Sequence, residues 1–268
     1  MVLNQWRWRM GTEPAELRAE IGDLGLRYFR SGSGPIAIKL HHSTGNPGWM
    51  PVDEVLAEEF DLIVPDLPGY NQSDRPAWAR SVRDIAVLTG HFIETLELED
   101  VVLIGCGLGG WVAAELASMN NHAISHLIVS GAPGLKPNEG LIEDQIMMDW
   151  DEYVQLSFSS NEHYEQTYGP DAADVYKELW DYSREMTARL TWKPWMYNRS
   201  LEPLLSLVDT SALVVWGSED RIVPQICGEQ YKNALTGSKL EIVEGAGHCV
   251  EHEQPEIFRD LISSFVKN

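Results

Sequence analysis

The residues with the clearest chemical meaning form a glycine-rich turn at 105–110, which reads Gly-Cys-Gly-Leu-Gly-Gly. The turn follows the apolar run 101–104, so the pattern is that of a strand that ends in a tight turn before a helix. The spacing matches the G-x-S-x-G motif, whose middle serine is lifted above a sheet to act as a nucleophile. Gly107 occupies the middle position and offers no side chain. The sequence therefore predicts a catalytic turn that lacks its nucleophile.

Alternating strand-like and helix-like segments surround this turn along most of the chain. Two short strand-like stretches, 17–21 and 26–29, come first. The alternation that follows predicts a mostly parallel sheet covered by helices on both faces. The predicted strands of this part span 36–40, 62–64, 101–104, 124–130, 212–216 and 240–243, and the predicted helices span 52–60, 82–96, 110–119, 229–235 and 257–266.

A different pattern occupies residues 135–200. Helices predicted over 141–157 and 172–190 are rich in aromatic residues, among them Trp150 and Trp195. Most of these aromatic side chains are expected to pack the helices onto the body of the protein, because large aromatic residues are usually buried. Trp150 and Trp195 are also candidates for the lining of a pocket.

The position of this helical block predicts the domain organisation. The block separates two halves of one strand–helix pattern, so residues 135–200 are expected to form a helical cap inserted in a core of residues 1–134 and 201–268. Open α/β sheets bind ligands at the carboxyl ends of their strands. We therefore expect the cap to cover that edge of the sheet, where a small molecule would bind.

Several segments, taken together, resemble the α/β-hydrolase superfamily across essentially the whole chain. Besides the turn at 105–110, they are Leu-His-His-Ser-Thr-Gly at 40–45, Asp-Leu-Pro-Gly-Tyr-Asn-Gln-Ser-Asp at 66–74, Val-Trp-Gly-Ser-Glu-Asp-Arg-Ile-Val-Pro at 215–224 and Gly-Ala-Gly-His at 245–248. The order of nucleophile position, acid and histidine is the one that this fold uses. The resemblance implies an α/β-hydrolase fold with a mostly parallel eight-stranded sheet, flanking helices and an inserted helical cap.

The resemblance also implies roles for individual residues. His248 would be the base and Asp220 its partner, with Glu219 as a fallback acid one residue out of register. A histidine with an unperturbed pKa near 6.5 accepts a proton near neutral pH, and a carboxylate holds its ring in one tautomer. The backbone N–H groups of Ser43 and Leu108 would form the oxyanion hole.

Glycine at position 107 has three possible explanations. Glycine removes most of the backbone strain that a side chain would suffer at this turn, which is on the order of 1–3 kcal/mol. The missing side chain would also leave space beside His248 for a water molecule or a bulkier substrate. Finally, the chain could be a serine hydrolase inactivated by a deliberate Ser-to-Gly substitution at 107.

Four other residues are candidate parts of the site. Cys106 precedes the middle of the turn and should point back toward the sheet, as a small buried residue that also lines the pocket. Ser43 has a hydroxyl near the expected substrate but no aligned base. His42 stands where the family usually has glycine, and we expect it to line the pocket. Cys249 adjoins His248 but lacks a motif that would make it reactive.

The composition disfavours several classes of partner and location. With 41 acidic and 20 basic residues the net charge is −21, which repels phosphate backbones and anionic membranes, so neither a nucleic acid nor a membrane is expected as a partner. Three cysteines without framework spacing favour a reducing, cytoplasmic environment. Residues 1–16 do not read as a signal peptide, and no stretch reaches the roughly 18 apolar residues of a membrane span.

The leading hypothesis is an enzyme that acts on a small, partly apolar carbonyl compound without a covalent intermediate. His248, with Asp220, would deprotonate water or the substrate, leading to hydrolysis of an ester, amide or activated C–C bond, or to proton transfer or elimination. The alternatives are a catalytically inactive binding protein and a serine hydrolase inactivated by substitution at Gly107. Neither a cofactor nor a metal is expected, since no Gly-x-Gly-x-x-Gly follows the first strand and the pair at 41–42 is too short a cluster. The sequence indicates no oligomeric state.

Overall fold

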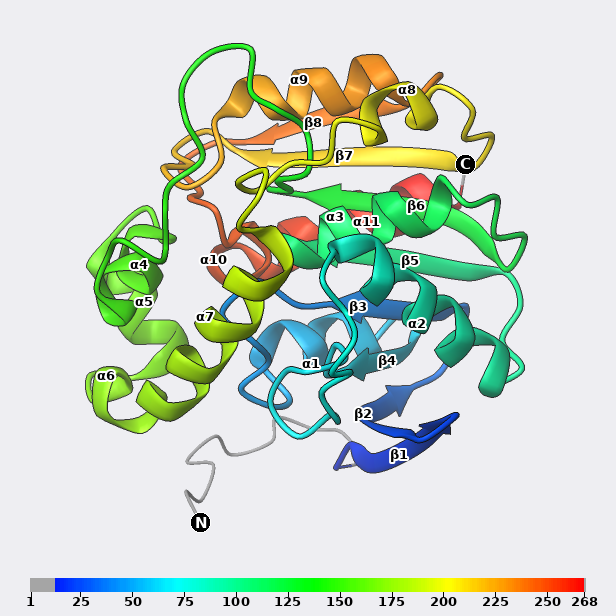
Figure 1. Ribbon diagram of the computed structural model, residues 1–268, viewed down its shortest axis with the longest axis horizontal. Helices are drawn as coiled ribbons and strands as arrows, with labels where there is room; N and C mark the ends of the chain where they lie inside the picture. The colour runs from blue at the N-terminus through cyan, green and yellow to red at the C-terminus, as the bar shows by residue number, and fades with distance from the viewer. Residues whose placement is uncertain (1–12, 268) are drawn as a thin grey trace.

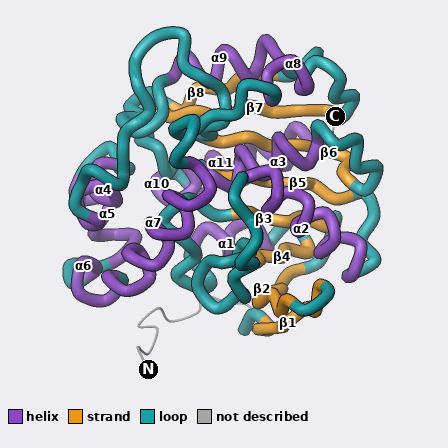
Figure 2. The backbone as a smooth tube through the Cα atoms, in the orientation of Figure 1, coloured by secondary structure: helices purple, strands orange, loops and turns teal. Residues whose placement is uncertain are grey.

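The computed structural model describes residues 13–267, and its centre is an eight-stranded sheet (Figures 1 and 2). The strands are β1 (Ala15–Ile21), β2 (Leu24–Gly32), β3 (Ile36–Leu40), β4 (Asp61–Pro65), β5 (Val101–Cys106), β6 (Ile124–Ser130), β7 (Ser211–Gly217) and β8 (Lys239–Val243). They lie in the order β1-β2-β4-β3-β5-β6-β7-β8. β2 pairs antiparallel with β1 and β4, whereas the other neighbouring strands are parallel. The predicted mostly parallel eight-stranded sheet is therefore confirmed.

Helices cover both faces of the sheet, as the alternation predicts. They are α1 (Pro51–Ala57), α2 (Val82–Thr95), α3 (Leu108–Ala117), α8 (Leu201–Leu205), α9 (Gln225–Ala234), α10 (Val250–Glu253) and α11 (Pro255–Val266). α2, α3, α8 and α9 pack in a row on one face, and α1, α10 and α11 pack together on the other (Figure 1). Side chains of β5 alternate between two buried cores, with Val101 and Leu103 on the α2–α3 side and Val102 and Ile104 on the α1–α11 side. Burial of both faces explains the nearly continuous apolar runs of the central strands.

A further set of helices lies between β6 and β7 in the sequence and at one end of the sheet in space (Figure 1). This α4–α7 segment consists of α4 (Trp150–Leu156), α5 (Asn161–Tyr168), α6 (Ala172–Val175) and α7 (Lys177–Thr191). Thr187 on α7 donates a hydrogen bond to the carbonyl oxygen of Ser43 (3.1 Å) and is also hydrogen-bonded to the hydroxyl of Tyr70 (2.7 Å). Because Ser43 and Tyr70 follow β3 and β4, the segment contacts the loops at the carboxyl ends of these strands.

Two helix predictions in this region are wrong in their extent. The helix predicted over 141–157 is present only as α4, because Asp144 accepts a hydrogen bond from the backbone N–H of Ile146 (2.9 Å) and closes a turn. The helix predicted over 172–190 is interrupted at Tyr176, whose φ of −104° and ψ of 6° lie outside the α-helical region. The short helix α5 is absent from the prediction.

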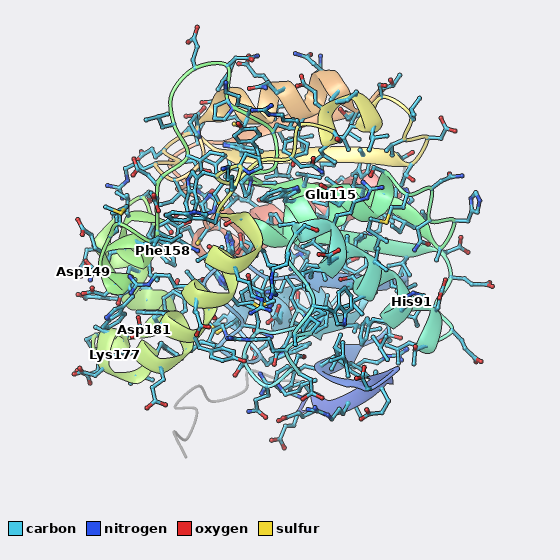
Figure 3. The ribbon with its side chains drawn as sticks, in the orientation of Figure 1. His91, Glu115, Asp149, Phe158, Lys177 and Asp181 are labelled. Carbon is cyan, nitrogen blue, oxygen red and sulfur yellow. The ribbon has the colours of Figure 1, made fainter. Side chains whose placement is uncertain are left out.

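Glu115 on α3 is a buried charge that joins three parts of the chain (Figure 3). Its carboxylate accepts hydrogen bonds from Nε1 of Trp111 (3.1 Å), Nη1 of Arg83 on α2 (3.0 Å) and Nδ2 of Asn198 after α7 (2.6 Å). Hydrogen bonds to a charged acceptor are the stronger kind in proteins. They therefore help to fix α3, and with it the glycine-rich turn from which α3 begins.

Three further expectations concern membrane spans, the N-terminus and the division of the chain into a core and a cap. Within residues 13–267, no helix is both long enough and apolar enough to span a membrane. The reading of residues 1–16 as lacking a signal peptide concerns mostly residues 1–12, which lie outside the described residues. The division into a core (1–134 and 201–268) and a cap (135–200) stays a prediction.

Candidate active site

The turn at 105–110 has the backbone that its glycines predict. Gly107 is the N-cap of α3 with φ 53° and ψ −120°, a conformation that costs on the order of 1–3 kcal/mol for a residue with a side chain. The chain also passes close to itself here. A Cβ at Gly105 would lie 2.4 Å from the carbonyl oxygen of Gly109, and a Cβ at Gly109 would lie 2.4 Å from that of Leu40. Glycine at these positions therefore allows β5 to turn directly into α3.

His248 and Asp220 are brought together by the loops that follow β8 and β7. Nδ1 of His248 lies 2.9 Å from Oδ2 of Asp220, and both side chains are almost fully buried. Oδ1 of Asp220 accepts hydrogen bonds from the backbone N–H groups of Ile222 (2.8 Å) and Val223 (2.9 Å). Glu219, the fallback acid, is exposed. Asp220 is thus fixed on both oxygens and favours the His248 tautomer that carries its proton on Nδ1.

The space beside Gly107 is filled by His42. A Cβ built on Gly107 would lie 2.3 Å from Nδ1 of His42. The expectation of free space there for water or a bulkier substrate is therefore wrong. The His42 ring is buried and packs edge to face against the His248 ring, with their centroids 4.9 Å apart. His42 thus contacts both residues that carry the site prediction.

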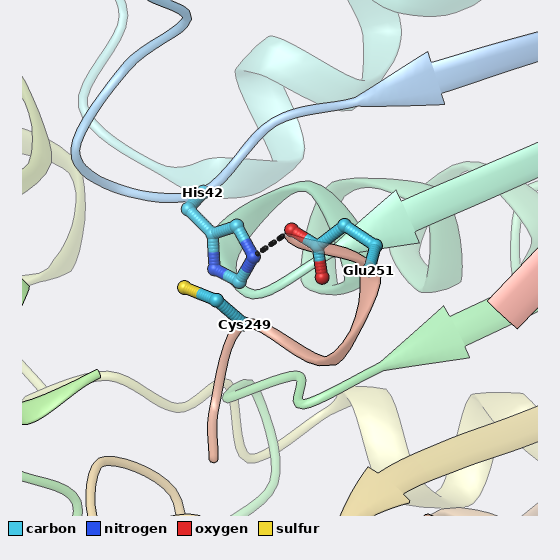
Figure 4. Close-up of side chains that lie close together, drawn as sticks. All are labelled: His42, Cys249 and Glu251. Atoms are coloured by element: carbon cyan, nitrogen blue, oxygen red, sulfur yellow. Dashed lines mark hydrogen bonds and ion pairs between the residues drawn. The ribbon is translucent and has the colours of Figure 1, made fainter. Parts of the chain in front are cut away.

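Glu251 holds His42 in this position (Figure 4). Oε1 of Glu251 lies 2.7 Å from Nε2 of His42. Burial alone would raise the pKa of Glu251, but its interactions with His42, His252 and Lys39 outweigh burial and hold this pKa well below its usual range. Glu251 is therefore a carboxylate that accepts the Nε2–H of His42. Among the described residues, neither Nδ1 of His42 nor Oε2 of Glu251 has a hydrogen-bond partner, although both atoms are buried.

An ion pair and two cysteines surround the His42–Glu251 pair. Nζ of Lys39 and Oδ1 of Asp53 are 2.7 Å apart in a buried ion pair that joins the end of β3 to α1. Cys106 and Cys249 are buried, and desolvation together with the charge of Glu251 raises the pKa of both thiols well above the usual value. Both cysteines are therefore protonated and weakly nucleophilic.

His42, Cys249 and Glu251 form a buried group in residues 13–267 that has the side-chain types of a metal site. One potential ligand atom from each residue lies within 4.8 Å of the others. Cysteine binds a metal as a thiolate, whereas the raised pKa of Cys249 favours its thiol. Nε2 of His42 is also already hydrogen-bonded to Glu251. The contacts present are therefore those of a hydrogen-bonded network.

The two residues predicted to supply the oxyanion hole lie at the start of α3 and after β3. Leu108 is the first residue of α3, whose N-terminus carries a partial positive charge. In the turns and loops of the described chain, the backbone N–H groups of Leu108 and Ser43 donate to no backbone carbonyl. The Ser43 hydroxyl donates to Oε1 of Gln145 (2.8 Å). It is thus bonded to an amide and not to a base, which leaves it weakly nucleophilic.

Two narrow cavities flank these residues. Lining residues of one include His42, Cys106 and Glu251, and those of the other include Trp150. Each cavity has room for about one water molecule. Trp195, the remaining candidate for a pocket lining, lines neither of them and packs against the core on the α2–α3 side. A larger ligand in these two cavities therefore requires movement of the α4–α7 segment or of the loop after β3.

Sequence reasoning missed Glu251, His252 and Gln145 as parts of this network. A signal for Glu251 existed, because His42 departs from the family's glycine and a buried histidine needs a polar partner. The sequence offers several carboxylates for that role, however, and only tertiary structure selects among them. Gln145 lies in a loop without a motif, so no sequence signal could have found it.

Comparison with known proteins identifies the family. A model of the alpha/beta hydrolase family matches residues 40–261. The AB hydrolase superfamily protein YfhM of Bacillus subtilis is 28% identical over 267 residues, which cover 88% of this chain and 91% of that protein. The 2-hydroxy-6-oxononadienedioate/2-hydroxy-6-oxononatrienedioate hydrolase 1 of Dechloromonas aromatica is 24% identical over 266 residues, which cover 91% of each protein.

Solved structures show the same fold. The 2-hydroxy-6-oxo-6-phenylhexa-2,4-dienoate hydrolase of Rhodococcus sp. strain RHA1 superposes with a TM-score of 0.76 at 19% identity, over 96% of this chain and 99% of that one. The predicted α/β-hydrolase fold, with its mostly parallel eight-stranded sheet and flanking helices, is confirmed. The chain therefore belongs to the alpha/beta hydrolase family.

Proposed function

We propose that this chain is an enzyme that acts on a small, partly apolar carbonyl compound, with His248 as general base and Asp220 as its partner. The observation that carries the proposal is their buried hydrogen bond, 2.9 Å long, next to His42 and Gly107. Membership of a hydrolase family supports hydrolase-like activity. Two similar proteins are named as hydrolases of 2-hydroxy-6-oxo acids, which are carbonyl compounds of this kind.

In the proposed reaction, Nε2 of His248 removes a proton from water or from the substrate. The proton on Nδ1 stays bonded to Asp220, which stabilises the imidazolium that forms. The backbone N–H groups of Ser43 and Leu108 stabilise the negative charge that develops on the carbonyl oxygen. The imidazolium then returns its proton to the leaving group or to the product. No covalent bond to residue 107 is needed.

Residues 135–200 have the role of a cap in this proposal. Two hydrogen bonds support this role. The hydroxyl of Ser43 donates one to Gln145, and Thr187 donates the other to the carbonyl oxygen of Ser43. Both connect residues 135–200 to the loop that supplies an oxyanion donor. A ligand that moves the cap would therefore also move that loop.

The crowding at Gly107 bears on the alternatives. A serine there would have its Cβ 2.3 Å from Nδ1 of His42, so it would require the His42 side chain to move, which argues against a single Ser-to-Gly substitution in an ordinary serine hydrolase. A binding protein without turnover is the second candidate. The absence of a nucleophilic side chain at Gly107 favours it.

The test is turnover of 4-nitrophenyl esters, anilides and 1,3-diketones by the wild type, His248→Ala, Asp220→Asn and the control Glu219→Gln. We expect His248→Ala to lower kcat/KM by about 100-fold or more, because a general base contributes that much. Asp220→Asn should have a similar effect by favouring the wrong tautomer. Glu219→Gln removes a charge at an exposed neighbouring position and should leave the rate within about twofold.

Two results would contradict the proposal. Activity that survives His248→Ala would assign the chemistry to other residues. Absence of both hydrolysis and proton transfer on any substrate tested, together with a ligand-dependent rise in the melting temperature, would support the binding protein instead.

A further inference from the structure

We infer that His42 and Glu251 form a second acid–base pair, which occupies the side-chain position of residue 107 and works together with His248. The inference rests on the proposed function, because it assigns the second proton-transfer group of the same site. It also narrows the reaction class from hydrolysis or proton transfer to proton transfer.

The first support is the position of the His42 ring. Its Nδ1 lies 2.3 Å from the point where a Cβ of residue 107 would stand, and its Cγ and Cε1 each lie 3.1 Å from that point. The ring therefore fills the space into which a serine side chain would project. An attacking water cannot occupy the same space. This position therefore holds a base. It holds no nucleophile that could be transferred to a substrate.

The second support is the state of the two nitrogens of His42. Nε2 lies 2.7 Å from Oε1 of the Glu251 carboxylate and donates to it, so Nδ1 is the nitrogen that is left for chemistry. That nitrogen is buried and has no partner among the described residues. Leaving a buried acceptor unpaired costs about 1–3 kcal/mol, so such a group calls for an explanation. A proton exchanged with a substrate at Nδ1 provides one.

The third support is the arrangement of the two histidines. His42 is bonded to a buried carboxylate through Nε2, and His248 is bonded to one through Nδ1, so each ring keeps one nitrogen for chemistry. Their centroids are only 4.9 Å apart. Two rings this close, each anchored to its own carboxylate, can reach the same substrate. One ring can then act as acid while the other acts as base.

These features fit a substrate with an acidic C–H next to a carbonyl group. One imidazole accepts the C–H proton, and the electron pair of that bond forms the C=C bond of an enolate. The other histidine, which enters the cycle protonated, donates a proton to the oxygen, which gives the enol. If the carbonyl compound has a C=C bond between its β and γ carbons, the enol is a dienol: the first ring returns its proton to the γ carbon while the enol O–H gives its proton back to the other ring, which shifts the double bond and restores both rings. The atoms and electrons balance without a cofactor or an oxidant.

A first experiment tests whether His42 occupies the position of a residue-107 side chain. Gly107→Ser, His42→Gly and the double variant are treated with a fluorophosphonate, which labels activated serines. We expect labelling only in the double variant, since only there is the serine free of the His42 ring, and loss of that labelling on adding His248→Ala. Labelling of Gly107→Ser at the same rate as the double variant would overturn the inference. No labelling in any folded variant would overturn both the inference and the proposed function.

A second experiment tests the chemistry with 5-nitrobenzisoxazole, a small aromatic probe for a base. A base removes its C–H proton, the C≡N bond forms, the N–O bond breaks and its electron pair leaves on the coloured phenolate. We expect wild-type catalysis, at least about tenfold lower kcat/KM in His42→Gln and in His248→Ala, and no change after EDTA treatment. Glu251→Gln should lower kcat/KM less than His42→Gln does and should shift the pH profile, because Glu251 positions His42 and does not touch the probe.

The outcomes separate the two claims. If His248→Ala loses activity and His42→Gln does not, the inference fails and the proposed function stands. If neither variant matters, or if the wild type is no faster than free imidazole, both fail. Activity that needs added Zn²⁺ would identify the group of His42, Cys249 and Glu251 as a metal site and overturn the inference.

A third measurement needs no ligand. In the ¹⁵N NMR spectrum of the histidines, assigned by the signals missing from His42→Gln, we expect an unprotonated Nδ1 and a protonated Nε2 for His42. Glu251→Gln should alter this pattern. A proton found on Nδ1 with none on Nε2 would overturn the inference.

Discussion

The two histidine–carboxylate pairs of the site differ in how completely their hydrogen bonds are satisfied. Both oxygens of Asp220 are bonded, one to His248 and the other to two backbone N–H groups. Glu251 has one oxygen bonded to His42 and one without a partner, and Nδ1 of His42 also lacks a partner. The Asp220 pair is thus built into the loop structure, whereas the Glu251 pair is anchored on one side only. A rigid pair is suited to orienting the His248 ring, and a partly unsatisfied pair is suited to exchanging a proton with a ligand.

Acidification should have the largest effect, and the groups responsible lie next to the His42–Glu251 pair. His41 and His252 adjoin His42 and Glu251, and burial lowers the pKa of each to about 3. His41 shows why: its Nε2 accepts the N–H of Leu67 (3.0 Å), so a proton there would place two donors against each other. The unfolded chain binds these protons near pH 6.5, so the unfolded state holds more protons between pH 6.5 and 3. The free energy of unfolding therefore falls as the pH falls through this window.

The expected loss is about 1.4 kcal/mol per pH unit for each histidine, or on the order of 5 kcal/mol between pH 6.5 and 4.5. Urea unfolding at a series of pH values measures it. His252→Gln, which removes one of the two groups, should halve the slope. A slope that His252→Gln leaves unchanged would show that the acid sensitivity arises elsewhere.

Removal of each carboxylate in turn should show which of the two pairs contributes more to the free energy of unfolding. Asp220→Ala leaves His248 and two backbone N–H groups without their acceptor, and we expect a loss of about 3–5 kcal/mol of unfolding free energy. Glu251→Ala leaves the Nε2–H of His42 unpaired and removes a weaker 3.5 Å contact with Nε2 of His252, and it should cost about 1–3 kcal/mol. Urea unfolding at pH 7 measures both variants. Equal losses would contradict the difference in anchoring.

Gly107→Ala tests the contact between the turn and His42. The left-handed backbone and the 2.3 Å approach to Nδ1 of His42 should together cost about 2–4 kcal/mol. Gly22→Ala is a matched control, because Gly22 has a φ of 63° and open space where its Cβ would stand. It should cost only about 1 kcal/mol. Adding His42→Gly should relieve Gly107→Ala, and strictly additive effects in this double-mutant cycle would contradict the contact.

Glu219→Gln should have the smallest effect. Glu219 is exposed and one residue from Asp220, so its substitution should change the unfolding free energy by less than about 0.5 kcal/mol. The measurement is the urea midpoint at pH 7. A larger loss than that of Asp220→Ala would reverse the assignment of the acid.

The parts of the fold that the sequence predicts well are those with local signals. β3 (Ile36–Leu40) and β6 (Ile124–Ser130) have the predicted bounds, because each is a largely apolar run limited by turn residues. The helix predicted over 141–157 fails because a side-chain hydrogen bond of Asp144 outweighs the helical pattern. The mostly parallel order of the central strands follows from the alternation and needs no knowledge of side-chain contacts.

In the candidate site, too, the residues with local sequence signals could be predicted and the others could not. The positions of His248 and Asp220 follow from motif order, and the structure places them in hydrogen-bonding contact, while their catalytic roles stay a prediction. The contact of His42 with Glu251 joins residues 209 positions apart and depends on how two loops meet. Neither residue has a local pattern that points to the other. Such a pair can be recognised only once the fold is known.

The close approach of His42 to Gly107 restricts the mutational routes open to this chain. A change of Gly107 to serine alone would meet the His42 ring, and a change of His42 to glycine alone would leave Glu251 without its hydrogen-bond donor. Either first step toward a serine hydrolase therefore passes through a less stable protein. Each substitution is favourable only when the other is already present. The steric contact thus acts as a barrier between two chemistries that one fold can support.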